Sequence, residues 1–158
     1  MIRIELDNPA RDDVARLLDE HLTDMFATSP AESVHALDHT ALAGPDISFW
    51  TARDGSTLLG CAALKRFPPD RGEIKSMRTS TAARGRGVGG LLLNHVVAIA
   101  RQDRLDGLYL ETGTQDYFAA ARRLYRHHGF AECPPFASYR LDPNSVFMHL
   151  GLRGLPDP

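Results

Sequence analysis

Hydrophobic residues recur along the chain with two different spacings, which predict where helices and strands lie. Apolar positions three or four residues apart follow Asn8-Pro9, where Asn8 suits a helix cap and Pro9 the first turn. The stripe of this first helix is Val14, Leu17, Leu18, Leu22 and Met25. The segment Ser29-Pro30-Ala31-Glu32 has the form of a capping box and predicts a second, shorter helix.

Alternating or continuous apolar runs predict strands over 2–6, 47–53, 57–66, 72–80, 108–111, 130–141 and 145–150. Asp54-Gly55 is a strong hairpin signal between the second and third of these runs. Two more helices are predicted over 88–102 and 114–128, the latter capped by Thr114 and ended by Gly129. This order lacks a regular strand–helix alternation, so it predicts an α+β fold with a largely antiparallel central sheet.

The chain has 158 residues, which is the size of one domain, here predicted over 1–150 with a short tail over 151–158. With 43% hydrophobic and 24% charged residues the composition is that of a globular protein, and the net charge of −2 argues against nucleic acid as a partner. No apolar run predicts a signal peptide or a membrane span, and no His, Cys and Asp set has metal spacing. A cytoplasmic location follows, with Cys61 and Cys133 as reduced thiols.

The segment Arg84-Gly85-Arg86-Gly87-Val88-Gly89, followed by Gly90, joins a predicted strand to a predicted helix. Glycines let the backbone approach a ligand closely, and the first amides of a helix attract phosphate. The segment lacks the Gly-Lys-Ser/Thr ending of a P-loop, and its glycine spacing and antiparallel surroundings disfavour a dinucleotide fingerprint. A purely structural glycine turn is the alternative, which the two arginines make less attractive.

This segment resembles the signature of the GCN5-related N-acetyltransferase (GNAT) family, Arg/Gln-x-x-Gly-x-Gly/Ala. A second stretch, 121–130, is similar to the late helix of that family, with Leu124-Tyr125 and then Gly129-Phe130. The resemblance implies a single GNAT-like domain with a mixed sheet, helices on both faces, and two middle strands that splay apart.

The resemblance also implies acetyl-CoA as co-substrate, with its pyrophosphate on the backbone of 86–90 and its pantetheine arm along the end of the strand before the loop. The thioester then lies between 73–79 and 108–112. The cofactor-binding residues so implied are Met77, Arg78, Thr79, Arg84, Gly85, Arg86, Gly87, Val88, Gly89 and Gly90.

Acetyl transfer to an amine needs a base for the ammonium proton and a donor for the leaving thiolate. The resemblance gives these roles to Glu73 and Tyr125, with Glu111 as the rival base. The alternatives are an exposed strand glutamate paired with Lys75 or Arg78, and a half-buried tyrosine that only packs.

For the acceptor, the resemblance places the early helical region and the last hairpin at the site. These contribute His35 and Tyr139, with Glu111 nearby, while His39 is a further candidate in the early region. We expect direct transfer in a ternary complex to the primary amine of a small molecule. An enzyme for protein lysines or N-termini and a non-catalytic acyl-CoA sensor are the alternatives. An exposed edge of the last hairpin is compatible with a homodimer.

Overall fold

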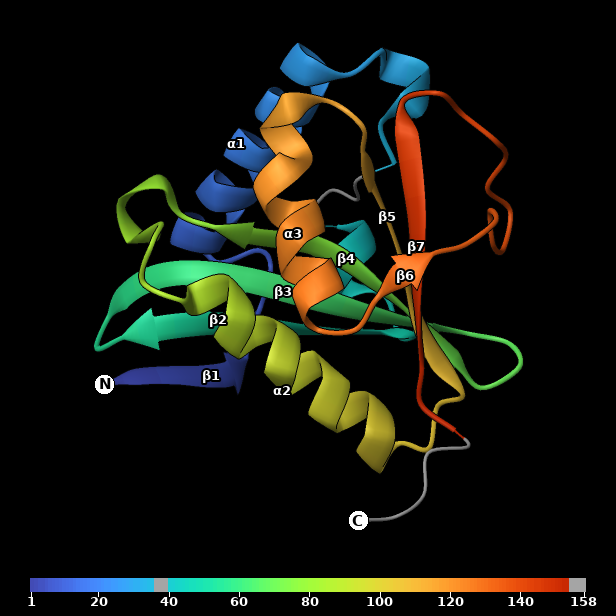
Figure 1. The fold of residues 1–158 in the computed structure, drawn as a ribbon. Coiled ribbons are helices and arrows are strands. Elements are labelled where there is room, and N and C mark those ends of the chain that lie inside the picture. The colour runs from blue at the N-terminus through green and yellow to red at the C-terminus, as the bar shows by residue number, and fades with distance from the viewer. Residues whose placement is uncertain (36–39, 154–158) are drawn as a thin grey trace.

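The structure, a computed structural model, describes residues 1–35 and 40–153. In this part of the chain, seven strands form one sheet in the order β1-β2-β3-β4-β5-β7-β6 (Figure 1). Neighbouring strands are antiparallel except for β4 and β5, which are parallel. The strands are β1 (Ile2–Leu6), β2 (Ile47–Asp54), β3 (Thr57–Phe67), β4 (Arg71–Thr79), β5 (Gly107–Gly113), β6 (Ala131–Glu132) and β7 (Ser145–Gly151).

Helix α1 (Asp12–Thr28) covers one face of the sheet, whereas α2 (Val88–Gln102) and α3 (Ala119–His127) cover the other (Figure 1). Successive side chains along β2 and β3 point to opposite faces of the sheet, so these strands contribute to the apolar clusters on both faces. Phe49 and Cys61 pack with the apolar stripe of α1, and Trp50 and Ala62 pack in the larger cluster with α2. The predicted α+β class, with a mostly antiparallel mixed sheet and helices on both faces, is thus confirmed.

The sheet opens in its middle. Strands β4 and β5 pair only where Arg71, Gly72 and Glu73 face Gly107, Leu108 and Tyr109, and beyond this register they diverge. A bulge in β4 adds to the distortion, because Ala63 pairs with Lys75 while Cys61 pairs with Arg78. Ser76, inside the bulge, has a φ of 50°, in the left-handed region. The backbone of β4 beyond Glu73 therefore faces a gap rather than β5.

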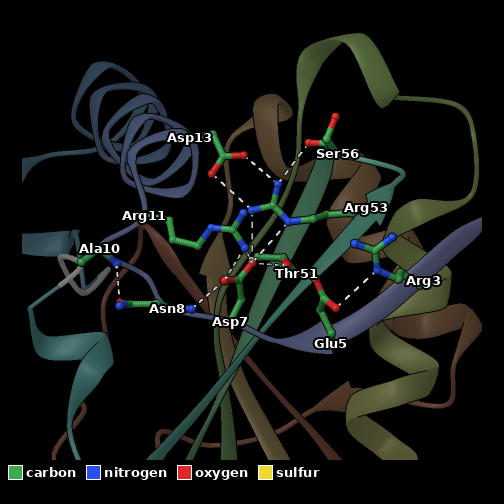
Figure 2. Close-up of polar contacts among 10 residues, drawn as sticks. All are labelled: Arg3, Glu5, Asp7, Asn8, Ala10, Arg11, Asp13, Thr51, Arg53 and Ser56. Carbon is green, nitrogen blue, oxygen red and sulfur yellow. Dashed lines mark hydrogen bonds and ion pairs between the residues drawn. The ribbon is translucent and has the colours of Figure 1, made fainter.

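A buried ion cluster ties β1, β2 and α1 together at the other end of the sheet (Figure 2). Arg53, with 2% of its side chain exposed, contacts Asp13 at 2.7 Å and Asp7 at 3.1 Å. Burial works to raise the pKa of Asp7, but hydrogen bonds from Thr51, the Asn8 amide, Arg11 and Arg53 outweigh it and lower the pKa to about 2. The cluster fixes the turn that leads from β1 into α1.

Two predicted helix starts are wrong. Helix α1 begins at Asp12 rather than at Pro9, because Asn8 Oδ1 accepts from the Ala10 amide at 2.9 Å and closes a local turn instead of a helix. The capping-box segment forms only one 3-10 turn, Ala31–Ser33, with no side-chain cap. Its Ser33 hydroxyl instead donates to Asp142 across the molecule at 2.6 Å.

The chain after α2 also differs from expectation. Thr114 does not cap a helix, since its hydroxyl donates to the Pro143 carbonyl, and a 3-10 turn (Asp116–Phe118) precedes α3. Gly129 ends α3 in the predicted left-handed conformation, with φ of 95°. The predicted strand over 130–141 shrinks to Ala131–Glu132, because Pro134 and Pro135 follow and cannot donate to a strand ladder.

The other predicted elements agree closely with the structure. The first strand and the helix after the glycine segment have the predicted bounds, and Gly55 turns the β2–β3 hairpin with φ of 60°. The predicted tail over 151–158 begins within the described part, where β7 ends at Gly151. Residues 154–158 and the candidate His39 lie outside the described residues.

Candidate active site

A cavity of about 520 Å³ lies where β4 and β5 separate. Its walls come from α1, β4, the glycine segment, β5, α3 and the segment between β6 and β7. The sequence-predicted residues that line it are His35, Glu73, Met77, Arg78, Thr79, Arg84, Gly85, Gly87, Val88, Gly89, Gly90, Glu111, Tyr125 and Tyr139. Residues predicted from separate motifs are thus brought together in one cavity.

The glycine segment forms an open backbone cradle at one end of the cavity. Gly85 and Gly87 have φ values of 82° and 77°, which side-chain-bearing residues rarely adopt. A Cβ at either glycine would meet no protein atom within 4 Å, so the space beside them is free for a ligand. Gly87 caps α2, and the next three residues contribute first-turn amides that have no partner within the helix. The residues present therefore fit a pyrophosphate.

The side chains of Arg84 and Arg86 lie in different surroundings. Arg84 lines the cavity beside the cradle, where its charge complements a phosphate. Arg86 lies at the surface, where its guanidinium is 3.5 Å from Asp54 of the β2–β3 turn. Its amide donates to the Ala83 carbonyl at 3.3 Å. Of the two predicted arginines, the structure brings only Arg84 to the cavity.

Glu73 is buried, with 5% exposure, and belongs to a polar cluster at the other end of the cavity. Its Oε2 accepts from the Tyr139 hydroxyl at 2.5 Å and lies 3.2 Å from Lys75 Nζ. Lys75 Nζ also donates to Tyr139 Oη at 2.9 Å and to the His35 carbonyl at 3.2 Å. The glutamate is therefore paired with Lys75, as the structural alternative expected, but it is not exposed.

Glu111 enters the same end from β5. Burial, together with the negative charge of Glu73, raises the pKa of Glu111 to about 7 despite the opposing charge of Lys75. Burial and the charge of Glu73 likewise raise the pKa of Tyr139 far above its usual range. Two carboxyl groups in one cavity thus differ in their surroundings, which is a common arrangement in acid–base sites.

Tyr125 is buried, with 8% exposure, and lines the cavity from α3. Burial, with a smaller contribution from the charge of Glu111, raises the pKa of Tyr125 to about 12. Its hydroxyl therefore keeps its proton across the physiological range. Its ring also packs edge-on against Phe130 at 5.9 Å, so Tyr125 is both a packing residue and a hydroxyl donor available to the cavity.

Helix α1 supplies cavity residues that the sequence analysis missed. His21 and Met25, one helical turn apart, line the cavity, and burial and the nearby Arg78 lower the pKa of His21 to about 4. Arg78 pairs with Asp24 at 2.9 Å, and its guanidinium lies 3.3 Å from the Tyr117 hydroxyl. The sequence signal for these two residues is their spacing of four positions, which places them on one face of the helix. The apolar stripe of the same helix already accounts for Met25, so this spacing did not indicate a cavity.

Within residues 1–35 and 40–153, no group of His, Cys, Asp and Glu side chains is placed to hold a metal ion. Over the same residues, no helix combines the length and the apolar character that a membrane span requires.

A pyrophosphate cradle that opens into a gap between two splayed strands, beside buried carboxyl and hydroxyl groups, matches the site that the family resemblance implies for an acyl-CoA-dependent acyltransferase. The family model described as the acetyltransferase (GNAT) family matches residues 14–130, and the chain belongs to this family. The chain is accordingly an N-acetyltransferase whose co-substrate is acetyl-CoA, which sets aside a non-catalytic sensor.

Curated relatives match almost the whole chain. It is 45% identical over 152 residues to the uncharacterized N-acetyltransferase YedL of Escherichia coli, covering 96% of each protein. It is 41% identical over 151 residues to an IAA acetyltransferase of Azospirillum brasilense, covering 93% of this chain and 95% of that protein. A Bacillus subtilis acetyltransferase solved in complex with CoA shares the fold, with a TM-score of 0.71 at 19% identity over 96% of this chain and 99% of that one.

Proposed function

We propose that the protein transfers the acetyl group of acetyl-CoA to the primary amine of a small molecule, with both substrates bound together. The observation that carries the small-molecule assignment is that the early region and the last segment contact each other. The Ser33 hydroxyl donates to Asp142 at 2.6 Å, and the rings of His35 and Tyr139 meet edge-on at 5.0 Å. These contacts join the two walls that a long peptide groove would have to separate.

When bound, acetyl-CoA supplies an activated acetyl group, which passes to the acceptor nitrogen as the thioester C–S bond breaks. In our proposal the cradle holds the pyrophosphate of this co-substrate, and the open edge of β4 holds its pantetheine arm. The bulge at Ser76 turns the local backbone away from the regular ladder, so the Met77 amide is a candidate donor to the carbonyl oxygen. Proximity in one cavity then contributes much of the rate.

For the proton of the incoming ammonium we favour Glu111 over Glu73. A base is most effective when its pKa lies near the working pH, and the pKa of Glu111 is about 7. Glu73 Oε2 is already occupied by Tyr139 and Lys75, so we assign Glu73 the role of orienting the acceptor. Tyr125 donates a hydrogen bond from Oη to the leaving sulfur and keeps its proton, because burial raises its pKa to about 12.

The experiment is acetyl-CoA-dependent release of free thiol with a panel of small amines and with lysine and N-terminal peptides. We expect release with a small-amine class and little with peptides, and Glu73→Gln should reduce it. Preferred turnover of peptides would replace the small-molecule assignment with protein acetylation.

The cytoplasmic location, which two free cysteines support, and the homodimer stay predictions.

A further inference from the structure

The charges at the acceptor end of the cavity restrict which amine can bind there. Glu73, Lys75 and Glu111 lie at this end, and Tyr139 and His35 complete its wall. Two carboxyl groups therefore face one ammonium group. When both carboxyl groups are ionised, the end of the cavity carries one negative charge that the protein does not balance.

Lys75 is not available to a ligand. An ammonium group has three protons to donate, and Lys75 Nζ has three oxygen partners: the Glu73 carboxylate at 3.2 Å, Tyr139 Oη at 2.9 Å and the His35 carbonyl at 3.2 Å. Only 9% of its side chain is exposed. A carboxylate on the acceptor could bind Lys75 only by displacing one of these partners.

The two arginines that line the described cavity are also committed elsewhere or lie far from this end. The Arg78 guanidinium pairs with Asp24 at 2.9 Å, and 6% of its side chain is exposed. Arg84 lies at the opposite end, beside the pyrophosphate cradle. His21 is uncharged near neutral pH because burial and Arg78 lower its pKa to about 4. Arg140, on the same segment as Tyr139, is exposed and is not among the cavity-lining residues.

We propose that the acceptor is a cationic amine with no carboxylate beside its amino group, and that the site rejects the corresponding α-amino acids. This inference rests on the proposed function and names the substrate class of the same site. The uncompensated carboxylate attracts the ammonium group, and a second carboxylate on the ligand would face Glu73 and Glu111 without a free lysine or arginine. Like charges placed together in this way are a strong source of discrimination.

The test uses matched pairs that differ only in the carboxylate and carry a single primary amine: histamine and histidine, tyramine and tyrosine, agmatine and arginine. Thiol release gives kcat/KM for each member, and calorimetry with CoA present gives its binding independently of turnover. For every pair that reacts or binds, we expect the amine to be favoured by at least ~10-fold. Amino acids that react or bind as well as their amines would overturn the inference while leaving the proposed function intact.

Calorimetry separates the two proposals further. Preferential binding of amines without turnover would support the inference and count against the proposed function, whereas no binding or turnover of any member would contradict both. Glu111→Gln should weaken amine binding and narrow the preference within each pair. Glu132→Gln is the matched control, because that carboxylate lies on exposed β6 and pairs with Arg126 at 3.1 Å. An unchanged preference in Glu111→Gln would contradict the electrostatic argument.

Discussion

Replacing Glu111 with glutamine tests which carboxyl group accepts the proton. The pKa of Glu111 is about 7, so its ionised fraction is about one half at pH 7 and about one tenth at pH 6. If Glu111 is the base, kcat/KM should rise nearly tenfold between pH 5 and 6 and level off above pH 7. The assay is thiol release from pH 5 to 8.5 with an acceptor amine that titrates well above this range.

Glu111→Gln should abolish this ascending limb and lower the rate at pH 8 by ~10²-fold. Glu73→Gln should also lower the rate, since it removes the partner of Tyr139 and Lys75, but it should keep the limb. The limb should move to lower pH, because the charge of Glu73 contributes to the raised pKa of Glu111. A limb that persists in Glu111→Gln and disappears in Glu73→Gln would refute the assignment.

The same pKa has a consequence for stability. A carboxyl group whose pKa is higher in the folded than in the unfolded protein destabilises the fold as pH rises from the unfolded value to the folded one. The rise from 4.5 to about 7 corresponds to at most ~3 kcal/mol, before screening of this half-buried group by solvent. Urea unfolding should therefore show Glu111→Gln to be more stable than wild type at pH 8 and nearly equal at pH 4. A mutant that is less stable at pH 8 would contradict this sign.

Three further substitutions test other parts of the structure. Gly87→Val should abolish acetyl-CoA binding in calorimetry, because a side chain at φ of 77° strains the cradle and fills its open space, whereas Gly55→Val strains a distant turn and should retain binding. Tyr125→Phe should lower kcat by ~10²-fold with acetyl-CoA affinity nearly unchanged, and an unchanged kcat would remove its hydroxyl from the reaction. Arg53→Met should cost about 3–5 kcal/mol in urea unfolding at pH 7, because it removes the buried cation shared by Asp7 and Asp13 and leaves Asp7 only the half-exposed Arg11, and a loss below about 1 kcal/mol would show that the cluster is marginal.

The features that local sequence predicted are those that depend on local physics. Glycine spacing before a helix predicted a backbone that a ligand can approach closely, and the structure has positive φ at Gly85 and Gly87 there; periodicity predicted α2 to its last residue. Strand order and the opening between β4 and β5 came instead from the family resemblance. That step succeeded because two motifs, at 84–89 and 121–130, meet in one cavity.

The features that sequence missed depend on contacts between distant segments. Arg53 is a buried residue of β2, and nothing nearby in the sequence shows that Asp7 and Asp13 surround it. The structural alternative to a catalytic role for Glu73 was an exposed glutamate, yet Glu73 is buried and accepts a hydrogen bond from Tyr139, 66 positions later. The sequence does not predict the bulge at Ser76, because the residue in the left-handed conformation there is a serine and not a glycine.

Two regions of the sheet treat buried charge in opposite ways, and this contrast bears on function. At the β1–β2 end, Arg53 is matched by two aspartates, and the low pKa of Asp7 shows a carboxylate that the fold keeps ionised. At the β4–β5 gap, Lys75 is shared by the cluster around Glu73, so Glu111 has no dedicated cation, and burial raises the pKa of Glu111 to about 7. A second lysine beside Glu111 would stabilise the region around the gap. It would also lower the pKa of Glu111 and make that carboxylate a weaker base near neutral pH. The missing countercharge is therefore consistent with a site in which the acceptor ammonium supplies that charge when it binds.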